Sequence, residues 1–206
     1  MTILDIHTHH AAPQPNGVIA VSPADFNPAP DQLYSVGIHP WQTVEDTTEE
    51  VWEKMEQAAR HPQVVAIGEC GIDLLKGGPL FRQMIVLKRE ALLAESLGKP
   101  LILHSVKGQE MIIGMKKEMN PSVNWMIHGF RGKPTVAQMY LKAGLWLSLG
   151  ENFNPDSLSV IPSDCLLAET DESPCSIQEV IEKISSAIGH DITQTVADNA
   201  FRFLNF

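Results

Sequence analysis

Histidines and carboxylates recur in this sequence at the points where short apolar segments end. His7 and His9 form an H-x-H pair, and side chains two apart on a strand point to the same face, which Asp5 shares. The residues with this placement are His7, His9, Glu69, His104, His128 and Asp171. Imidazole nitrogens and carboxylate oxygens are ligands of divalent metal ions. The sequence therefore predicts a metal site, and Asp5 could orient one of the metal-binding histidines without itself binding the metal.

Four histidines and two carboxylates are more ligands than one catalytic zinc ion requires. They suit two divalent ions about 3.5–4 Å apart with a carboxylate between them. Such a pair of ions stabilises the attacking and leaving oxygens and activates water near neutral pH. We therefore expect hydrolysis, with phosphoesters favoured. The sequence leaves the metal open among Zn, Mg and Mn, and the same ligands also bind Ni or Fe.

Eight short apolar segments are the candidate strands that would position these residues. They are residues 3–9, 17–22, 33–40, 64–70, 100–104, 123–130, 145–150 and 165–171. Several are almost continuously apolar, as in Val64-Val65-Ala66-Ile67, which is typical of parallel strands covered on both faces. In a barrel of parallel strands, the carboxyl ends converge on one site.

Amphipathic segments follow most of these strands, and the cleanest apolar stripe includes Ile177, Val180, Ile181 and Ile184. The pattern predicts a compact TIM-like (β/α)8 barrel, and an open doubly wound sheet is the competing architecture. Residues 11–16 and 23–32 are rich in proline and lack a helical period, so the first one or two helices should be reduced to loops. With 206 residues, we expect one hydrolase domain over 1–206.

Composition narrows the class of protein further. The chain is 44% hydrophobic and 19% charged, which supports a folded core, and its formal charge of −10 argues against general coating of nucleic acid or of anionic membranes. The three cysteines suit a reducing compartment, and we see no basic leader or transmembrane run. We therefore expect a soluble cytoplasmic protein. Phosphate-loop, dinucleotide, serine-elbow and C-x-x-C motifs are absent.

A series of short motifs resembles the TatD family of metal-dependent hydrolases, in the same order along nearly the whole chain. The motifs are Asp5-Ile6-His7-Thr8-His9, Gly37-Ile38-His39-Pro40, Ile67-Gly68-Glu69, Leu103-His104-Ser105, His128-Gly129-Phe130, Glu169-Thr170-Asp171 and the closing Asp198-Asn199-Ala200-Phe201-Arg202-Phe203. The family consists of amidohydrolase-type metal barrels, and its characterised members are deoxyribonucleases. The resemblance therefore implies a metal-dependent enzyme that acts on ester bonds.

The resemblance also implies a role for each matching residue. His7 and His9 would bind one divalent ion with Asp171, His104 and His128 would bind a second, and Glu69 would bridge the two. His39 would face the substrate or its phosphate, or else be a packed loop residue. His10 departs from the family pattern and is either an extra ligand or a polar loop residue. The chain is also shorter than typical members near residues 11–32 and 73–80.

The leading hypothesis is a monomeric phosphodiesterase, a deoxyribonuclease that acts on DNA ends or single strands. Asp171 would accept the proton of the attacking water, and Lys107 and Arg131, which follow metal-bearing strands, would meet substrate phosphates. One alternative is an amidohydrolase-like enzyme for a small phosphoester, a lactone or a C–N bond. Another is a degenerate metal-binding module without activity.

Overall fold

Eight parallel strands form the centre of the protein, in a computed structural model that describes residues 2–206. They are β1 (Asp5–Thr8), β2 (Gly17–Val21), β3 (Leu33–Val36), β4 (Val64–Asp73), β5 (Leu101–Val106), β6 (Trp125–Ile127), β7 (Trp146–Leu149) and β8 (Leu166–Ala168). Each strand pairs with the next one in the sequence. The segment after β8 returns to β1, where Asp171 donates to the His7 carbonyl and His9 donates to the Asp171 carbonyl, both at 3.0 Å. The barrel prediction is confirmed, and the open sheet is wrong.

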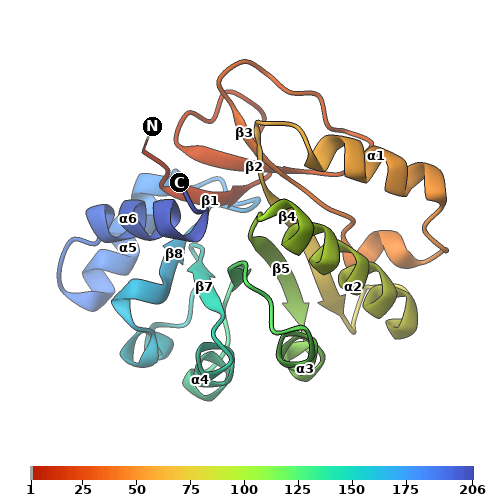
Figure 1. Cartoon of the computed structure of the whole chain (residues 1–206). Coiled ribbons are helices and arrows are strands. Elements are labelled where there is room, and N and C mark those ends of the chain that lie inside the picture. Colours follow the sequence, from red (N-terminus) through yellow and green to blue (C-terminus); the bar gives the residue numbers. More distant parts are fainter. Residues whose placement is uncertain (1) are drawn as a thin grey trace.

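Helices surround the strands on the outside of the barrel (Figure 1). The α-helices are α1 (Glu49–Ala59), α2 (Leu80–Leu97), α3 (Gln109–Met119), α4 (Pro134–Lys142), α5 (Ile177–Ile188) and α6 (Thr193–Phe203). As predicted, the described chain forms no α-helix between β1 and β2 or between β2 and β3. A short 3-10 helix, η1 (Pro40–Thr43), follows β3.

The connection from β7 to β8 also lacks an α-helix, which the sequence analysis did not predict. It consists of two 3-10 segments, η2 (Pro155–Val160) and η3 (Ser163–Cys165). Pro155 and Pro162 each begin one of these turns, and a proline in that place favours a short turn over a continuing helix. Three connections between consecutive strands therefore lack an α-helix, and loops and short turns cover the barrel beside β1, β2 and β8.

The barrel interior is a packed apolar cluster that lies directly beneath the chemistry-bearing residues. Ile102, Met126 and Leu167 are fully buried, and each precedes a polar residue of its own strand end by two positions. Phe203 and Ala200 of α6 belong to the same cluster, so α6 closes the opposite end of the barrel. Asn199 fixes this helix, because its side-chain amide donates to the carbonyls of Ser163 and Leu166 at 2.7 and 2.6 Å.

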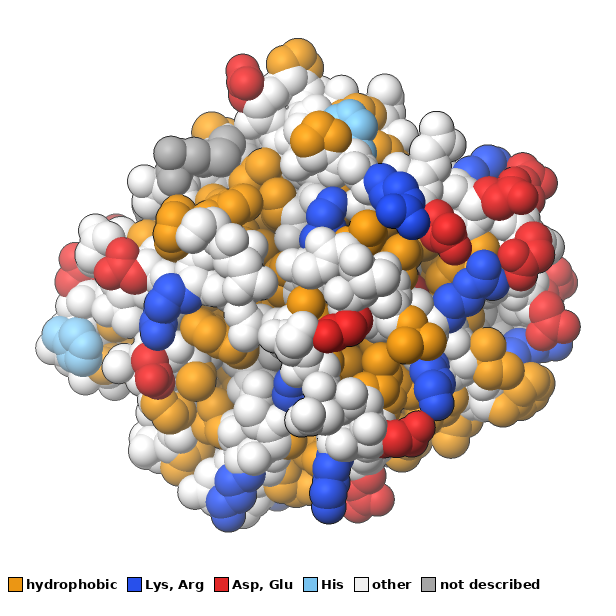
Figure 2. Space-filling model, in the orientation of Figure 1, with side chains coloured by type: hydrophobic (Ala, Val, Ile, Leu, Met, Phe, Trp, Pro, Cys, Tyr) orange, Lys and Arg blue, Asp and Glu red, His pale blue; other side chains and the backbone are white. Residues whose placement is uncertain are grey.

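Charges of both signs are interspersed on the surface around α1 and α2 (Figure 2). Arg89 pairs with Glu49, and Lys54 pairs with Glu50, each at 2.9 Å. Such exposed pairs contribute little stability, but they neutralise local charge. Among residues 2–206, none of the helices combines the length and the apolar character needed to cross a membrane.

Candidate metal centre

The polar strand ends converge on one cavity at the carboxyl end of the barrel. The cavity has a volume of about 490 Å³, within the range of small-molecule sites. Its chemistry-bearing lining includes His9, His39, Trp41, Glu69, His104, His128 and Asp171. His7 lies beneath them, fully buried. The six residues predicted to ligate metal are thus brought together, and His39 joins them.

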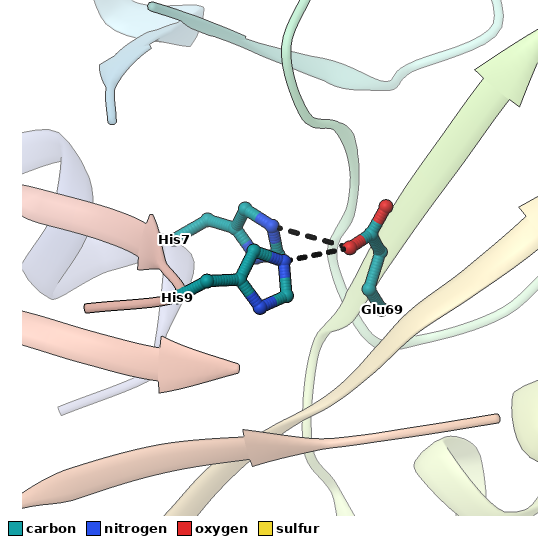
Figure 3. Close-up of side chains that lie close together, drawn as sticks. All are labelled: His7, His9 and Glu69. Atoms are coloured by element: carbon teal, nitrogen blue, oxygen red, sulfur yellow. Dashed lines mark hydrogen bonds and ion pairs between the residues drawn. The ribbon is translucent and has the colours of Figure 1, made fainter. Parts of the chain in front are cut away.

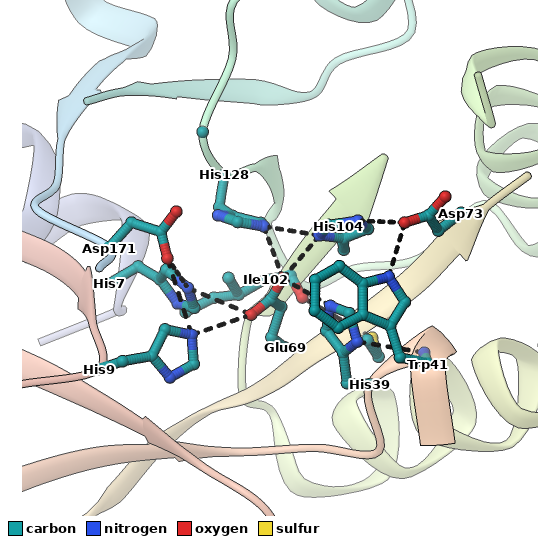
Figure 4. A network of polar contacts seen from close by, with 12 residues as sticks. His7, His9, His39, Trp41, Glu69, Asp73, Ile102, His104, His128 and Asp171 are labelled. Carbon is teal, nitrogen blue, oxygen red and sulfur yellow. Dashed lines mark hydrogen bonds and ion pairs between the residues drawn. The ribbon is translucent and has the colours of Figure 1, made fainter. Parts of the chain in front are cut away.

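Glu69 is the centre of this cluster, and its two carboxylate oxygens face different histidines. Oε2 lies 3.4 Å from His7 Nε2 and 3.2 Å from His9 Nε2 (Figure 3). Oε1 lies 2.7 Å from His104 Nδ1 and 2.7 Å from His128 Nε2 (Figure 4). Burial opposes ionisation of Glu69, but the charge of His128 and the surrounding hydrogen bonds hold the pKa of this carboxyl well below its usual range.

The surroundings of His7 point to a ligand at the first group of imidazoles, those of His7 and His9 at Glu69 Oε2. The His7 ring is fully buried, and within residues 2–206 neither ring nitrogen has a hydrogen-bond partner. Yet Nε2 points at two carboxylates, 3.4 Å from Glu69 and 3.9 Å from Asp171. A buried polar atom without a partner is costly and calls for an explanation. A cation placed between imidazole and carboxylates supplies one.

The second group of imidazoles, those of His104 and His128 at Glu69 Oε1, points to a ligand in a different way. His104 Nδ1 and His128 Nε2 approach each other to 3.1 Å, beside the same oxygen of Glu69. His39 Nε2 lies 3.1 Å from that oxygen as well. The side chains able to hold an ion form three sets: His7, His9 and Glu69; His7, His128 and Asp171; and His39, Glu69 and His104.

Two further carboxylates, which the sequence analysis did not assign, stand behind the histidines. Asp73, at the end of β4, lies 3.3 Å from His104 Nε2, and Glu169 lies 3.3 Å from His128 Nδ1. Burial works against the charge of Asp73, but hydrogen bonds from the Trp41 indole and from backbone N–H groups lower its pKa to about 2. A carboxylate in this position fixes the tautomer of an imidazole. Both carboxylates stand at the end of an apolar strand, and this position in the sequence could have identified them.

Asp171 has a backbone conformation that is rare outside glycine, with φ of +55°. Its carboxylate lies 3.7 Å from His9 Nε2, and its side chain is one-quarter exposed, so solvent reaches it. Asp5 supports this turn: its carboxylate accepts hydrogen bonds from the N–H and hydroxyl of Thr170 at 3.0 and 2.6 Å. Asp5 therefore positions the segment of Asp171 rather than the H-x-H imidazoles.

Close packing between β4 and β5 brings Glu69 within reach of His104. Gly68 and Gly71 have φ of +130° and +139°, and the pairing register shifts between Ile67 and Cys70. A Cβ atom at Gly71 would lie 2.1 Å from the His104 carbonyl oxygen. Glycine is therefore required here by both conformation and space.

The remaining predicted residues lie farther from the cavity. Lys107 is exposed in the turn after β5 and is not part of the cavity lining. Arg131 is exposed and borders a smaller cleft that shares Asp171 with the main cavity. His10 turns away, because its Nε2 lies 2.8 Å from the Ser173 carbonyl oxygen.

The barrel and its histidine–carboxylate cluster define the class: a parallel (β/α)8 barrel with a candidate metal centre at the carboxyl ends of its strands. Comparison with a sequence model of TatD related DNases gives a match over residues 26–205. The chain belongs to this family, and the resemblance seen in its motifs is confirmed. The matched range begins after the H-x-H pair of His7 and His9.

The chain is also similar to individual proteins in sequence, and to a solved structure in fold. The uncharacterized metal-dependent hydrolase YabD of Bacillus subtilis is 31% identical over 151 residues, which are 68% of this chain and 59% of YabD. The 3'-5' ssDNA/RNA exonuclease TatD of Erwinia tasmaniensis is 26% identical over 200 residues, covering 83% of this chain and 76% of that protein. The crystal structure of YjjV, a TatD homolog from Escherichia coli K12, has a TM-score of 0.83 at 21% identity, covering 99% and 98% of the two chains.

Proposed function

We propose that this protein is a metal-dependent phosphodiesterase that removes nucleotides from the ends of single-stranded nucleic acid. The main observation in support of this proposal is that the two oxygens of Glu69 face two separate groups of imidazoles. His7, His9 and Asp171 would hold one divalent ion, and His104 and His128 would hold the other, with Glu69 shared. His39 lies at the open side of the second group, where it would face the substrate phosphate.

When bound, two divalent ions would supply positive charge that stabilises the attacking and leaving oxygens of a phosphodiester. Water attacks phosphorus, and the bond from phosphorus to the leaving ester oxygen breaks. Asp171 would accept the proton of that water, and the partial exposure of its carboxylate at the cavity wall supports this role. The leaving oxygen takes a proton from solvent. Asp73 and Glu169 hold the rings of His104 and His128 in place throughout.

The choice of substrate rests on the relatives and on charge. The Erwinia TatD protein is named as an exonuclease for single-stranded DNA and RNA. With a formal charge of −10, this chain offers duplex DNA little long-range attraction, so contact with a few phosphates at an end is favoured. DNA is our first choice. Action as a monomer in the cytoplasm remains a prediction from the sequence.

A small phosphoester, as in other amidohydrolase-like barrels, is the second candidate. It is favoured by a cavity of about 490 Å³, which suits a molecule the size of one nucleotide or less. Lactones and C–N bonds belong to this same alternative.

A hydrolysis panel tests these proposals. The protein would be stripped of metal, reloaded with Zn²⁺, Mg²⁺ or Mn²⁺, and given single- and double-stranded DNA, RNA, a phosphomonoester and a lactone. We expect turnover of single-stranded oligonucleotides, with release of mononucleotides from one end. Turnover restricted to the small esters would favour the second candidate. No turnover with any metal, together with tight metal binding, would indicate a non-catalytic module.

A further inference from the structure

Trp41 is a partly exposed aromatic side chain at the wall of the metal-centre cavity. It belongs to η1, directly after His39-Pro40, and 46% of its surface is accessible. Its ring lies edge to face with the His39 ring, at 4.7 Å between centroids and 81° between planes. The His104 ring lies 6.1 Å away. The indole is thus adjacent to the place where a scissile phosphate would sit.

A hydrogen bond fixes the plane of this indole. Its Nε1–H donates to Asp73 Oδ2 at 2.6 Å (Figure 4). Asp73 is itself buried and accepts hydrogen bonds from the N–H groups of Leu75 and Lys76. Trp41 is therefore an exposed aromatic surface held rigid by a polar anchor rather than by packing. Pre-ordering of this kind reduces the entropy lost when a flat ligand group binds.

A cation lies next to the same ring. The ammonium of Lys76, an exposed side chain, is 4.7 Å from the Trp41 ring centroid. Proteins that bind single-stranded nucleic acid combine such elements, an aromatic ring for the base and a cation for the backbone. A base that stacks on the indole can take the place of the flexible lysine chain, while its ammonium meets the neighbouring phosphate.

We propose that Trp41 is the platform on which the base next to the cleaved phosphodiester stacks, with Lys76 contacting the adjoining phosphate. This inference rests on the proposed nuclease function and names how that site selects its substrate. Every base has a π face, so the contact accepts any sequence. A base within a duplex is already stacked and paired, and it cannot lie on the indole without fraying. Trp41 thus becomes a determinant of single-strand preference.

The test compares Trp41→Ala, Trp41→Phe and the control Phe81→Ala. Phe81 is also an exposed aromatic residue, at 61%, but it lies on α2 outside the cavity lining. Each variant would be given two single-stranded oligonucleotides, one intact and one whose end nucleotide is abasic. Loss of one stacked base weakens binding by about 5- to 140-fold. We expect KM to rise by this factor when wild type acts on the abasic end, and also when Trp41→Ala acts on the intact end. Trp41→Ala acting on the abasic end should show no further rise in KM.

Trp41→Phe separates stacking from the hydrogen bond, because phenylalanine keeps a ring but cannot donate to Asp73. We expect its KM to stay within about 3-fold of wild type, since most of the stacking area remains. Phe81→Ala should match wild type on both substrates. Binding is read independently with 2-aminopurine at the oligonucleotide end: its fluorescence should be quenched by Asp171→Asn protein and not by Asp171→Asn/Trp41→Ala.

The possible failures are distinguishable. If wild type degrades oligonucleotides but treats intact and abasic ends alike, the stacking role is wrong and the nuclease function stands. That comparison needs only wild-type protein, so it decides the matter even if Trp41→Ala does not fold. If wild type degrades no oligonucleotide and hydrolyses only small esters, the proposed function and this inference both fall.

Discussion

At the residue scale, the candidate centre depends on a buried carboxylate whose two oxygens serve different neighbours. Glu69 is 8% exposed, and five imidazoles lie within 3.4 Å of it: those of His39, His104 and His128 at Oε1, and those of His7 and His9 at Oε2. Without a cation, these imidazoles and this carboxylate stabilise one another, which raises the pKa of His9 mainly through its hydrogen bond with Glu69. With cations, the same atoms are available as ligands.

Replacing Glu69 by Ala should remove the shared ligand. We expect elemental analysis to find two divalent ions per wild-type chain and at most one in Glu69→Ala, with activity lost and the far-ultraviolet circular dichroism spectrum retained. Glu172→Ala is the matched control, because Glu172 lines the cavity but belongs to none of the three metal-capable sets. Full activity of Glu69→Ala would show that Glu69 is not a bridge.

Asp171 is proposed to act both as ligand and as proton acceptor, and Asp171→Asn distinguishes these roles. Asparagine keeps one carbonyl oxygen for a metal but accepts a proton poorly. We expect kcat to fall by about 10²- to 10⁴-fold, whereas metal affinity falls much less. Stopped assays with saturating metal and a parallel metal titration measure the two quantities. Equal losses would make Asp171 a ligand only.

At the scale of elements, helix α2 supports the loop that carries His39. Glu90 of α2 is fully buried and accepts a hydrogen bond from the Ile38 N–H at 2.7 Å. Burial raises the pKa of the Glu90 carboxyl well above its ordinary value of 4.5, although the Ile38 N–H opposes this shift. The shift favours the neutral form of the carboxyl, and the hydrogen bond from the Ile38 N–H joins α2 to the segment after β3.

A raised pKa in the folded state makes stability depend on pH in a defined direction. The contribution of protonated Glu90 is complete below pH 4.5, the unfolded value, and is lost as the pH rises toward the folded value. Glu90→Gln keeps the acceptor and cannot ionise. We expect the free energy of unfolding of wild type to fall relative to Glu90→Gln by up to about 1.4 kcal/mol per pH unit above this point.

Urea unfolding of both proteins at pH 5 and pH 8, with chelator present, measures this difference. The chelator removes the contribution of bound metal, so the two proteins differ only at Glu90. Parallel pH dependence of wild type and Glu90→Gln would mean that Glu90 does not change its ionisation on folding.

At the scale of the whole molecule, a negatively charged protein must bind negatively charged nucleic acid if the proposed function is right. Five basic residues lie in or beside the segments that follow the strands of the candidate metal centre: Lys76, Arg82, Lys107, Arg131 and Lys133. The structure pairs Arg82 with Asp46 at 2.7 Å and sets Lys76 over Trp41. Two bound divalent ions would bring the formal charge from −10 to −6 and concentrate that gain in the cavity. Binding through few phosphates follows.

The salt dependence of binding measures how many phosphates are contacted. If about three to five are neutralised, log affinity for a single strand should fall with log salt at a slope of roughly −2 to −3.5. Arg131→Ala should reduce the slope by about 0.7 with metal content unchanged, and the ion-paired Lys54→Ala should leave it unchanged. Oligonucleotide titrations with Asp171→Asn protein give these slopes. A slope near zero would contradict binding through phosphates.

The sequence by itself determined the strands and the residues at their ends. An apolar run closed by a histidine or a carboxylate is a local pattern, and parallel strands in a barrel turn every such end toward one place. His104 and His128 could therefore be predicted from their own segments. The loops in place of the first two helices were equally local, because proline restricts the backbone wherever it occurs.

Tertiary structure decided what each strand end touches. Asp73 lies behind His104 and beside Trp41, and both contacts join residues about thirty positions apart, the first of them across a β4–β5 pair whose register shifts between Ile67 and Cys70. Lys107 directly follows β5, yet the cavity is lined by His104 of that strand and by residues of other segments rather than by Lys107. Local patterns indicate which face a side chain occupies, whereas its partner depends on how the strands are staggered around the closed barrel.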